Sequence, residues 1–350
     1  MNDTQTNSLH DDKPVQPWIK RHPIWTAVFI IVGVLTLFLT ALFFLPFNVD
    51  DTSVPNPATS HDEAVARVEA IRAKEETSGE INPVCLSNLM THEEETEKVI
   101  VFYHGFTSCP EQFRELGEQF FEQGYNVYIP RLPYHGHTDR MSEALLQTTA
   151  EELAAFSTET IDIARGLGDE LTVAGLSGGG TVTAWIAQEH DDVEQVVMVA
   201  PFLGIGFIPA FLNRPVTQIA DNIPNIWMWW DPKSKADNPF SQDYQYPRYP
   251  LHALAEYLRL GFAAQRDADL NKPEVNRIVV ITNSNDESVN NAIINQFIDT
   301  WRQHEEEYLT TFDFEKELGL PHDVITPTRE DGNPSLVYPI IIENIIGAEE

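Results

Sequence analysis

The chain has 350 residues, of which 42% are hydrophobic, enough for one large domain with an appendage or for two small domains. Asp and Glu total 54 against 22 Lys and Arg, which gives a formal net charge of −32. A charge of this sign argues against binding to nucleic-acid phosphates or anionic lipid head groups by charge attraction. It suits a protein in high salt and equally an acidic surface that favours solubility.

Residues 24–47 contain no charged side chain and are almost entirely apolar. Because an α-helix rises about 1.5 Å per residue, about 22 residues span the hydrocarbon core of a bilayer, and we predict a single transmembrane helix here. A cleaved signal peptide is the alternative, but the run exceeds the ~7–15 apolar residues of a signal core. Lys20 and Arg21 precede the run and Asp50 and Asp51 follow it. The positive-inside rule therefore predicts a cytoplasmic tail over residues 1–23 and an extracytoplasmic remainder.

Residues 48–60 are rich in Pro, Asp, Ser and Thr, and we expect a short extended tether. The sequence Ser60-His61-Asp62-Glu63 resembles a capping box and predicts a helix that ends near Glu76 and packs on the main domain. Cys85 and Cys109 fall on the predicted outer side, where a disulfide can persist. The sequence is equally consistent with two buried thiols, because it does not reveal the distance between them.

From Lys98 onward, patterns typical of strands alternate with patterns typical of helices. We predict strands at 99–103, 125–130, 171–174, 193–200, 277–282 and 308–314, and helices at 110–123, 150–167, 181–189, 289–303 and 336–346. This alternation predicts an α/β domain over residues 61–350, with a mostly parallel central sheet and helices on both faces. Ligands bind such sheets at the carboxyl ends of the strands.

Residues 201–273 interrupt this alternation. The interval contains Trp227, Trp229 and Trp230, several prolines and a helical stretch at 251–264. An insertion of this length after a strand predicts a helical cap over the site. The tryptophans either form the core of the cap or line an apolar substrate channel.

The sequence Gly175-Leu176-Ser177-Gly178-Gly179 joins a predicted strand to a predicted helix. Consecutive glycines at a helix start are unfavourable by up to about 1 kcal/mol each relative to Ala, which indicates close backbone approach at this point. The spacing matches the G-x-S-x-G nucleophile elbow in its strand-turn-helix context. Ser177 is therefore the candidate nucleophile, and a glycine-rich structural turn is the alternative.

A serine nucleophile needs a base, and the base needs an acid that orients it. In elbow-type sheets these partners follow in the order Ser, acid, His. The turn after the strand 277–282 offers Asp286, with Glu287 as the alternative acid. Among the later histidines, His322 lies in the turn after the last strand, whereas His252 lies in the cap and His304 at a helix end. We therefore predict Asp286 as the acid and His322 as the base.

Donors for a developing oxyanion come from two backbone N–H groups in this kind of site. Gly178 at the helix start supplies the first. Phe106 supplies the second, since the strand 99–103 ends in His104-Gly105-Phe106-Thr107 and the glycine lets the chain turn. An ordinary glycine at the end of a strand is the alternative.

These motifs together resemble the α/β-hydrolase superfamily, near microbial carboxylesterases and monoacylglycerol-lipase-like enzymes, from Lys98 to the end of the chain. The resemblance rests on His104-Gly105-Phe106, the elbow at Ser177, Asp286 and Pro321-His322-Asp323. It implies a serine hydrolase of small-molecule or lipid-like esters that needs no cofactor or metal. Peptidase, thioesterase and acyltransferase activities remain alternatives. The loop at 133–138 departs from the Gly-His-Gly-x-Ser of many relatives, and the Trp-rich cap does not indicate a particular substrate.

Two other interpretations of the sequence assign the protein to a different functional class, a zinc-dependent hydrolase or a binding protein. The sequence His135-Gly136-His137-Thr138-Asp139 resembles the zinc-binding H-x-H-x-D of metallo-β-lactamase-like hydrolases. Arg140 stands where that family has another histidine, and the remaining histidines form no second ligand cluster. A membrane-tethered binding protein on a hydrolase scaffold is the other possibility, because fold does not imply function.

Overall fold

The computed structural model describes residues 17–237, 241–304 and 308–347. The chain divides into two compact units, residues 1–45 and 46–350. The first unit contains the short helix α1 (Trp18–Arg21) and the helix α2 (Pro23–Phe44). Within the described ranges, α2 is the one helix that is long and apolar enough to cross a membrane, a property that signal sequences share. It ends earlier than predicted because Leu45, which precedes a proline, is extended, with ψ 127°. Residues 1–16 of the predicted tail lie outside the described residues.

The second unit is built on a seven-stranded sheet in the order β1-β3-β2-β4-β5-β8-β9. All neighbouring strands are parallel except β1, which pairs antiparallel with β3, so the predicted mostly parallel sheet is confirmed. Its strands are β1 (Asn88–Met90), β2 (Thr96–Tyr103), β3 (Asn126–Ile129), β4 (Gly168–Leu176), β5 (Gln195–Val199), β8 (Arg277–Asn283) and β9 (Leu309–Phe314). The central strands are buried on both faces, as expected of a sheet covered by helices.

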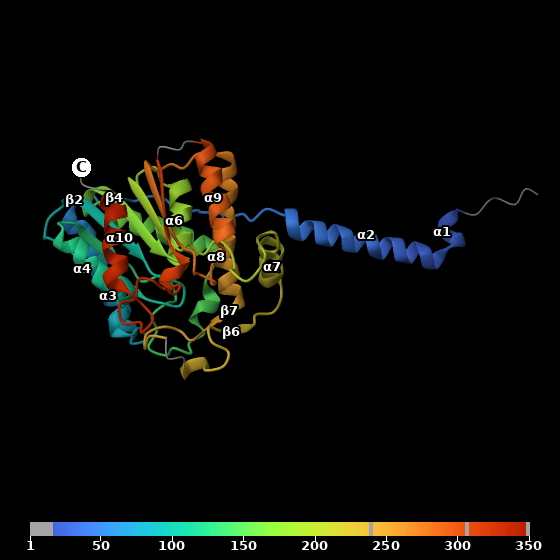
Figure 1. The fold of residues 1–350 in the computed structure, drawn as a ribbon, viewed down its shortest axis with the longest axis horizontal. Coiled ribbons are helices and arrows are strands. Elements are labelled where there is room, and N and C mark those ends of the chain that lie inside the picture. The colour runs from blue at the N-terminus through green and yellow to red at the C-terminus, as the bar shows by residue number, and fades with distance from the viewer. Residues whose placement is uncertain (1–16, 238–240, 305–307, 348–350) are drawn as a thin grey trace, which may run out of the picture. The chain divides into compact units, whose positions relative to one another are not determined.

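Helices cover both faces of this sheet. Figure 1 shows α4 and α10 on one side of the strands and α6, α8 and α9 on the other. The helices of this layered unit are α4 (Arg114–Glu122), α5 (Ala150–Ala164), α6 (Gly178–Glu189), α8 (Leu251–Leu270), α9 (Asn291–His304) and α10 (Pro334–Ile346). The predicted helix at 110–123 begins as a 3-10 turn, η2 (Pro110–Phe113), before α4.

The segment before the sheet packs against the rest of the second unit. The helix α3 (His61–Ser78) begins at its predicted N-cap, where Ser60 Oγ accepts the Glu63 N–H at 3.3 Å. Residues 48–60, expected to be a tether, contain no helix or strand but make several contacts with the unit. Asn56 donates its N–H to Asp162 Oδ2 at 2.7 Å, and Ala58 is buried. Phe47, just before this segment, is buried against Phe262 with the ring centroids 5.1 Å apart.

The interval predicted to form the cap has two structural parts. Its first part contains the helix α7 (Ala210–Asn222), the short turn η4 (Lys235–Asp237) and a two-stranded ribbon of β6 (Trp227–Trp229) and β7 (Arg248–Pro250). Its second part is α8, which confirms the predicted helix and extends it to Leu270. Because α8 packs along α6, it belongs to the helical layer beside the sheet.

Candidate active site

Ser177 lies in a sharp turn between β4 and α6. Its φ of 55° is unusual for a residue with a side chain, and such strain persists only where surrounding contacts hold it. Two backbone hydrogen bonds do so: Ser177 N–H donates to Val199 O at 3.0 Å, and Phe202 N–H donates to Ser177 O at 2.9 Å. Ser177 is therefore fixed at the carboxyl ends of β4 and β5, where ligands bind parallel sheets.

Two of the elbow glycines are required by close backbone approach. A Cβ on Gly175 would lie 2.3 Å from Gly179 O, and one on Gly179 would lie 2.0 Å from Tyr103 O. Both distances are far shorter than any real Cβ contact. The glycines thus allow α6 to leave the strand directly against the ends of β4 and β2, as their clustering in the sequence predicts.

Asp286 and His322 form a hydrogen-bonded pair. His322 Nδ1 lies 2.6 Å from Asp286 Oδ2; the Asp286 side chain has no exposed area, and that of His322 is 25% exposed. Asp286 lies in the turn between β8 and α9, and its other oxygen accepts the N–H groups of Ser288 and Val289 at 2.8 and 3.4 Å. Glu287, the alternative acid, is exposed.

The other two candidate bases, His252 and His304, contact backbone carbonyl groups away from Asp286. His252 Nε2 lies 2.6 Å from Ile223 O, and His304 Nε2 lies 2.6 Å from Ala268 O. Of the three histidines considered for the base, His322 is therefore the one that the structure brings to the predicted acid.

The interaction between Asp286 and His322 shifts the pKa of both side chains. Burial disfavours the charged form of His322, but the charge of Asp286 and the hydrogen bond to it prevail and raise the pKa of His322 above its ordinary value. Burial likewise opposes ionisation of Asp286, yet His322 and the two backbone N–H donors lower the pKa of Asp286. Donation by Nδ1–H to the carboxylate leaves Nε2 as the basic atom of neutral His322.

Ser177 and His322 line one cavity of about 270 Å³. In the described structure no hydrogen bond joins their side chains; catalytic contacts of this kind often tighten only when substrate binds. Apolar groups in the wall come from Phe106, Leu176, Trp230 and Pro247. Polar side chains that share the wall are Thr107, Ser108, Gln112, Ser241, Gln245, Ser288, Asp323 and Arg329. The cavity can therefore hold a small substrate with both apolar and polar parts.

The two predicted oxyanion donors are neighbours. A Cβ on Gly178 would lie 3.0 Å from the Phe106 nitrogen, and Gly178 is the first residue of α6, where backbone N–H groups lack partners within the helix. A buried side chain stabilises the loop that carries Phe106: the Gly105 N–H donates a hydrogen bond to Gln112 Oε1 at 2.7 Å. Its conformation is thus determined by a buried side chain that lies outside the motif.

His104 and His135 have structural partners. Leu132 N–H donates to His104 Nε2 at 3.1 Å, and His104 Nδ1 lies 3.0 Å from Gly105 O. Because Nε2 accepts a hydrogen bond, the His104 ring is neutral, and it connects the segments that follow β2 and β3. Burial also lowers the pKa of His135 to about 4, and its Nδ1 lies 2.7 Å from Pro133 O. Across the described ranges, no three His, Cys, Asp or Glu side chains are grouped as a metal site, including those at 135–139.

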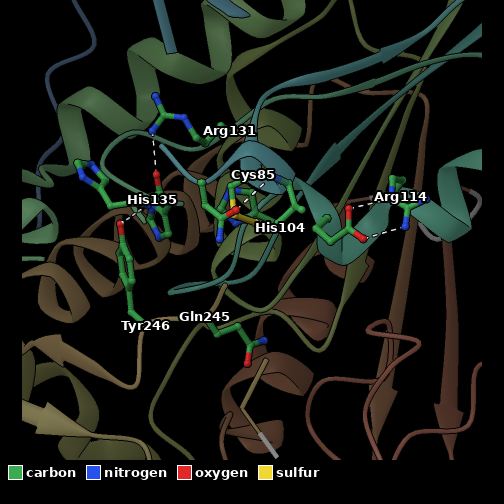
Figure 2. The surroundings of a disulfide bond; sticks show 12 residues. Cys85, His104, Arg114, Arg131, His135, Gln245 and Tyr246 are labelled. Atoms are coloured by element: carbon green, nitrogen blue, oxygen red, sulfur yellow. Dashed lines mark hydrogen bonds and ion pairs between the residues drawn. A yellow bond between two sulfur atoms is a disulfide. The ribbon is translucent and has the colours of Figure 1, made fainter. Parts of the chain in front are cut away.

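Cys85 and Cys109 form a disulfide bond. The bond joins the turn η1 (Pro83–Cys85) to the residue that precedes η2, directly after the loop with Phe106 and Thr107. Figure 2 shows it beside His104, with Arg131, His135 and Tyr246 close by. The sequence was consistent with a disulfide or with two buried thiols, and the structure contains the disulfide.

The parallel sheet and the sharp strand-to-helix turn at Ser177 define an α/β-hydrolase fold. The family model described as serine aminopeptidase S33 matches residues 94–308, more than half of the chain. The chain belongs to this family of α/β-hydrolases. The matched region includes Ser177 and Asp286, and His322 lies beyond it.

The chain is 29% identical over 176 residues to a thermostable monoacylglycerol lipase of Bacillus sp. (strain H-257), an alignment that covers 49% of this chain and 64% of that protein. The chain thus matches less than two thirds of this relative. Among solved structures, one from a study of the metagenome-derived lipolytic enzymes LipS and LipT has a TM-score of 0.59 and 19% identity over 76% of this chain and 98% of that one. The monoacylglycerol lipase of Paleococcus ferrophilus has a TM-score of 0.57 and 17% identity over 73% and 96%. These structural likenesses show the fold.

Proposed function

We propose that this protein is a membrane-anchored serine hydrolase that cleaves carboxylic esters through an acyl-enzyme on Ser177. The observation that carries the proposal is the 2.6 Å contact between His322 Nδ1 and the buried Asp286, with His322 and Ser177 in the wall of one cavity. His322 Nε2 removes the proton of Ser177 Oγ, which attacks the ester carbonyl. The N–H groups of Phe106 and Gly178 stabilise the oxyanion, and His322 protonates the leaving alcohol. Water activated by His322 then releases the acid.

Ester substrates are favoured by the resemblance of 176 residues of the chain to a monoacylglycerol lipase. A cavity of about 270 Å³ that has apolar and polar walls supports a small or lipid-like ester. The family description, serine aminopeptidase, supports a second candidate, an amide-cleaving enzyme that uses the same groups. Turnover of p-nitrophenyl esters from acetate to octanoate, compared with aminoacyl p-nitroanilides, distinguishes the two.

The nucleophile is tested by a fluorophosphonate probe on the wild type and on Ser177→Ala. Labelling of the wild type alone, with a loss of several orders of magnitude in kcat and an unchanged fold in Ser177→Ala, is the expected result. Ester hydrolysis that survives in Ser177→Ala would remove Ser177 from this role. A chain that neither reacts nor hydrolyses would be a binding protein on this fold.

For the anchor, we propose that α2 crosses the membrane with residues 1–23 in the cytoplasm and the hydrolase unit outside. Lys20 and Arg21 before the helix support this orientation, and so does the Cys85–Cys109 disulfide, since such bonds persist in oxidising compartments. Protease added to intact cells should reach the hydrolase unit, and carbonate washing should leave the chain in the membrane. Full protection from the outside protease would reverse the orientation.

A further inference from the structure

A second cavity lies between α3, α5 and the loop that follows β3. Its volume of about 470 Å³ falls in the range of small-molecule sites and exceeds that of the Ser177 cavity. The two cavities share no lining residue. Ile71 and Lys74 of α3 form part of the wall, and α3 precedes the residues 94–308 that match the family model. This cavity is therefore distinct from the candidate active site and is built in part by a segment outside the family match.

Tyr128 of β3 directs an unpartnered hydroxyl into this cavity. The residue is 1% exposed and lines the cavity. Val127 and Ile129 both lie near Gly117 of α4. Because side chains alternate along a strand, Tyr128 points to the opposite face of the sheet, toward α5. In the described part of the chain its hydroxyl makes no hydrogen bond, and since buried polar groups are normally paired, this hydroxyl is available to a ligand.

The charged side chains of the wall carry an excess of negative charge. Four glutamates, one lysine and one arginine line the cavity. The arginine is already paired, since Arg131 Nε donates to the buried Glu75 Oε1 at 2.9 Å. Three carboxylates and one ammonium group remain, on Glu80, Glu152, Glu159 and Lys74. A wall with this balance attracts a cationic ligand and repels an anionic one.

These carboxylates lie close to the unpartnered hydroxyl. Burial, and after it the charges of Glu159 and Glu75, raise the pKa of Tyr128 well above its ordinary value. Glu152 is held in place on the same side of the cavity, because its Oε1 accepts the hydrogen bond of the Tyr134 hydroxyl at 2.7 Å. The floor of the cavity therefore presents a neutral phenol, whose oxygen accepts hydrogen bonds, within the field of fixed carboxylates.

The rest of the wall is apolar and partly aromatic. Phe156 of α5 and Tyr134 of the loop contribute rings, and Ile71, Ile81 and Pro133 contribute aliphatic surface. Aromatic rings beside carboxylates favour organic cations, because the face of a ring attracts positive charge while the apolar surface buries the body of the ligand. A hydrated metal ion would leave this surface unused.

We propose that this cavity is a second binding site, whose ligand is a small organic amine with an aromatic or aliphatic body. The ammonium group lies between Glu152 and Glu159 and donates a hydrogen bond to the Tyr128 oxygen, while the body packs against Phe156 and Ile71. The site does not depend on ester hydrolysis, because none of its residues lines the Ser177 cavity.

The test of ligand class is calorimetric titration of the full chain in a nonionic detergent with tryptamine and with indole-3-propionate, which has the same ring system and the opposite charge. We expect tryptamine to bind with a Kd below about 1 mM, a modest affinity for a ligand of this size, and indole-3-propionate to bind at least tenfold more weakly. Equal affinity for the two compounds, or no saturable binding of tryptamine, would overturn the proposal.

The test of position uses Glu159→Gln and Tyr128→Phe, each of which should weaken tryptamine binding at least fivefold. Glu170→Gln, at an exposed glutamate outside the cavity, is the matched control and should leave the affinity unchanged. Because Glu159 is exposed, its variant retains the fold and decides the question even if Tyr128→Phe is unstable. An equal loss in Glu170→Gln would reduce the effect to general charge attraction and contradict the site.

Turnover of p-nitrophenyl acetate separates this site from the Ser177 cavity. Tryptamine should not raise the KM of this substrate as a competitor does. Competitive inhibition with a constant equal to the Kd would place the amine in the Ser177 cavity and overturn the assignment. A protein that hydrolyses no ester but binds tryptamine through Glu159 would contradict the proposed activity and confirm the second site.

Discussion

Trp230 Nε1 donates a 2.9 Å hydrogen bond to Thr107 Oγ1 and so connects the cap to the loop that carries Phe106. Thr107 has a φ of 68°, unusual for a residue with a branched side chain, and its carbonyl accepts the Tyr246 N–H at 3.0 Å. The cap therefore holds a strained residue directly beside the proposed oxyanion donor. Of the three cap tryptophans, Trp230 borders the cavity, whereas Trp227 and Trp229 stack on Arg248 and Lys235.

Trp230→Phe should lower kcat about fivefold with little change in KM, because it removes one hydrogen bond of about 1 kcal/mol that positions the loop. Trp229→Phe is the control, since that ring contacts Lys235. Thr107→Val removes the acceptor, and the double variant should lose no more than either single variant. Additive losses, or an effect confined to KM, would contradict the positioning role.

Gln112→Met should lower kcat and destabilise the fold by about 1–3 kcal/mol, because it leaves the buried Gly105 N–H without its acceptor and removes one of the donors to Asp323. Gln112 Oε1 accepts the Gly105 N–H at 2.7 Å, and Gln112 Nε2 donates to Asp323 Oδ2 at 2.9 Å. The side chain thus links the Phe106 loop to the neighbour of His322. Steady-state kinetics and urea unfolding measure the two effects. An unchanged kcat in a destabilised variant would limit Gln112 to a structural role.

Asp286→Asn should lower kcat by about 10⁴-fold and move the acid limb of the pH profile to lower pH. Only neutral His322 accepts a proton, so activity rises with pH through its pKa. Asp286 raises that pKa, and the limb of the wild type should therefore lie above the ordinary histidine value of about 6.5. The variant Asp286→Asn lacks the carboxylate charge that raises the pKa of His322, so this pKa should fall. An acid limb that does not move in Asp286→Asn would show that another group controls it.

Cys85→Ala/Cys109→Ala should lose about 3 kcal/mol of unfolding free energy, since the disulfide closes a loop with a sequence separation of 24. Urea unfolding under non-reducing conditions measures the loss. The wild type in reductant should approach the variant, which controls for the substituted side chains. Identical unfolding midpoints for the variant and the oxidised wild type would show that the bond contributes nothing to stability.

The parts of the site that follow from local patterns could be predicted from the sequence. The elbow at Ser177 has a strand before it, a helix after it and glycines that only close packing explains. The order of strands along the chain then placed Asp286 and His322 at strand ends on the same edge of the sheet. These inferences need the topology of the sheet but no knowledge of individual side-chain contacts.

Contacts between distant segments could not be predicted in this way. Gln112 and Asp323 are 211 positions apart, and a single glutamine in a helical turn has no distinguishing pattern. The Cys85–Cys109 bond depends on how η1 packs against η2. The strand β1 has three residues, too few to show an alternating pattern. The pairing of Trp227 with Pro250 in the cap ribbon depends on a connection of more than 15 residues.

Phe47 also determines where the hydrolase unit can be cut from its N-terminal helix. A soluble form that started at residue 61, where the sequence suggests that the domain begins, would lack a ring that fills the space beside Phe262. Loss of a buried phenylalanine costs roughly 3–5 kcal/mol, a large share of the stability of a typical domain. It would also remove the Phe47 and Asn48 carbonyls that accept hydrogen bonds from Arg266 and Arg259. A secreted or recombinant form that keeps this core must therefore begin no later than Phe47.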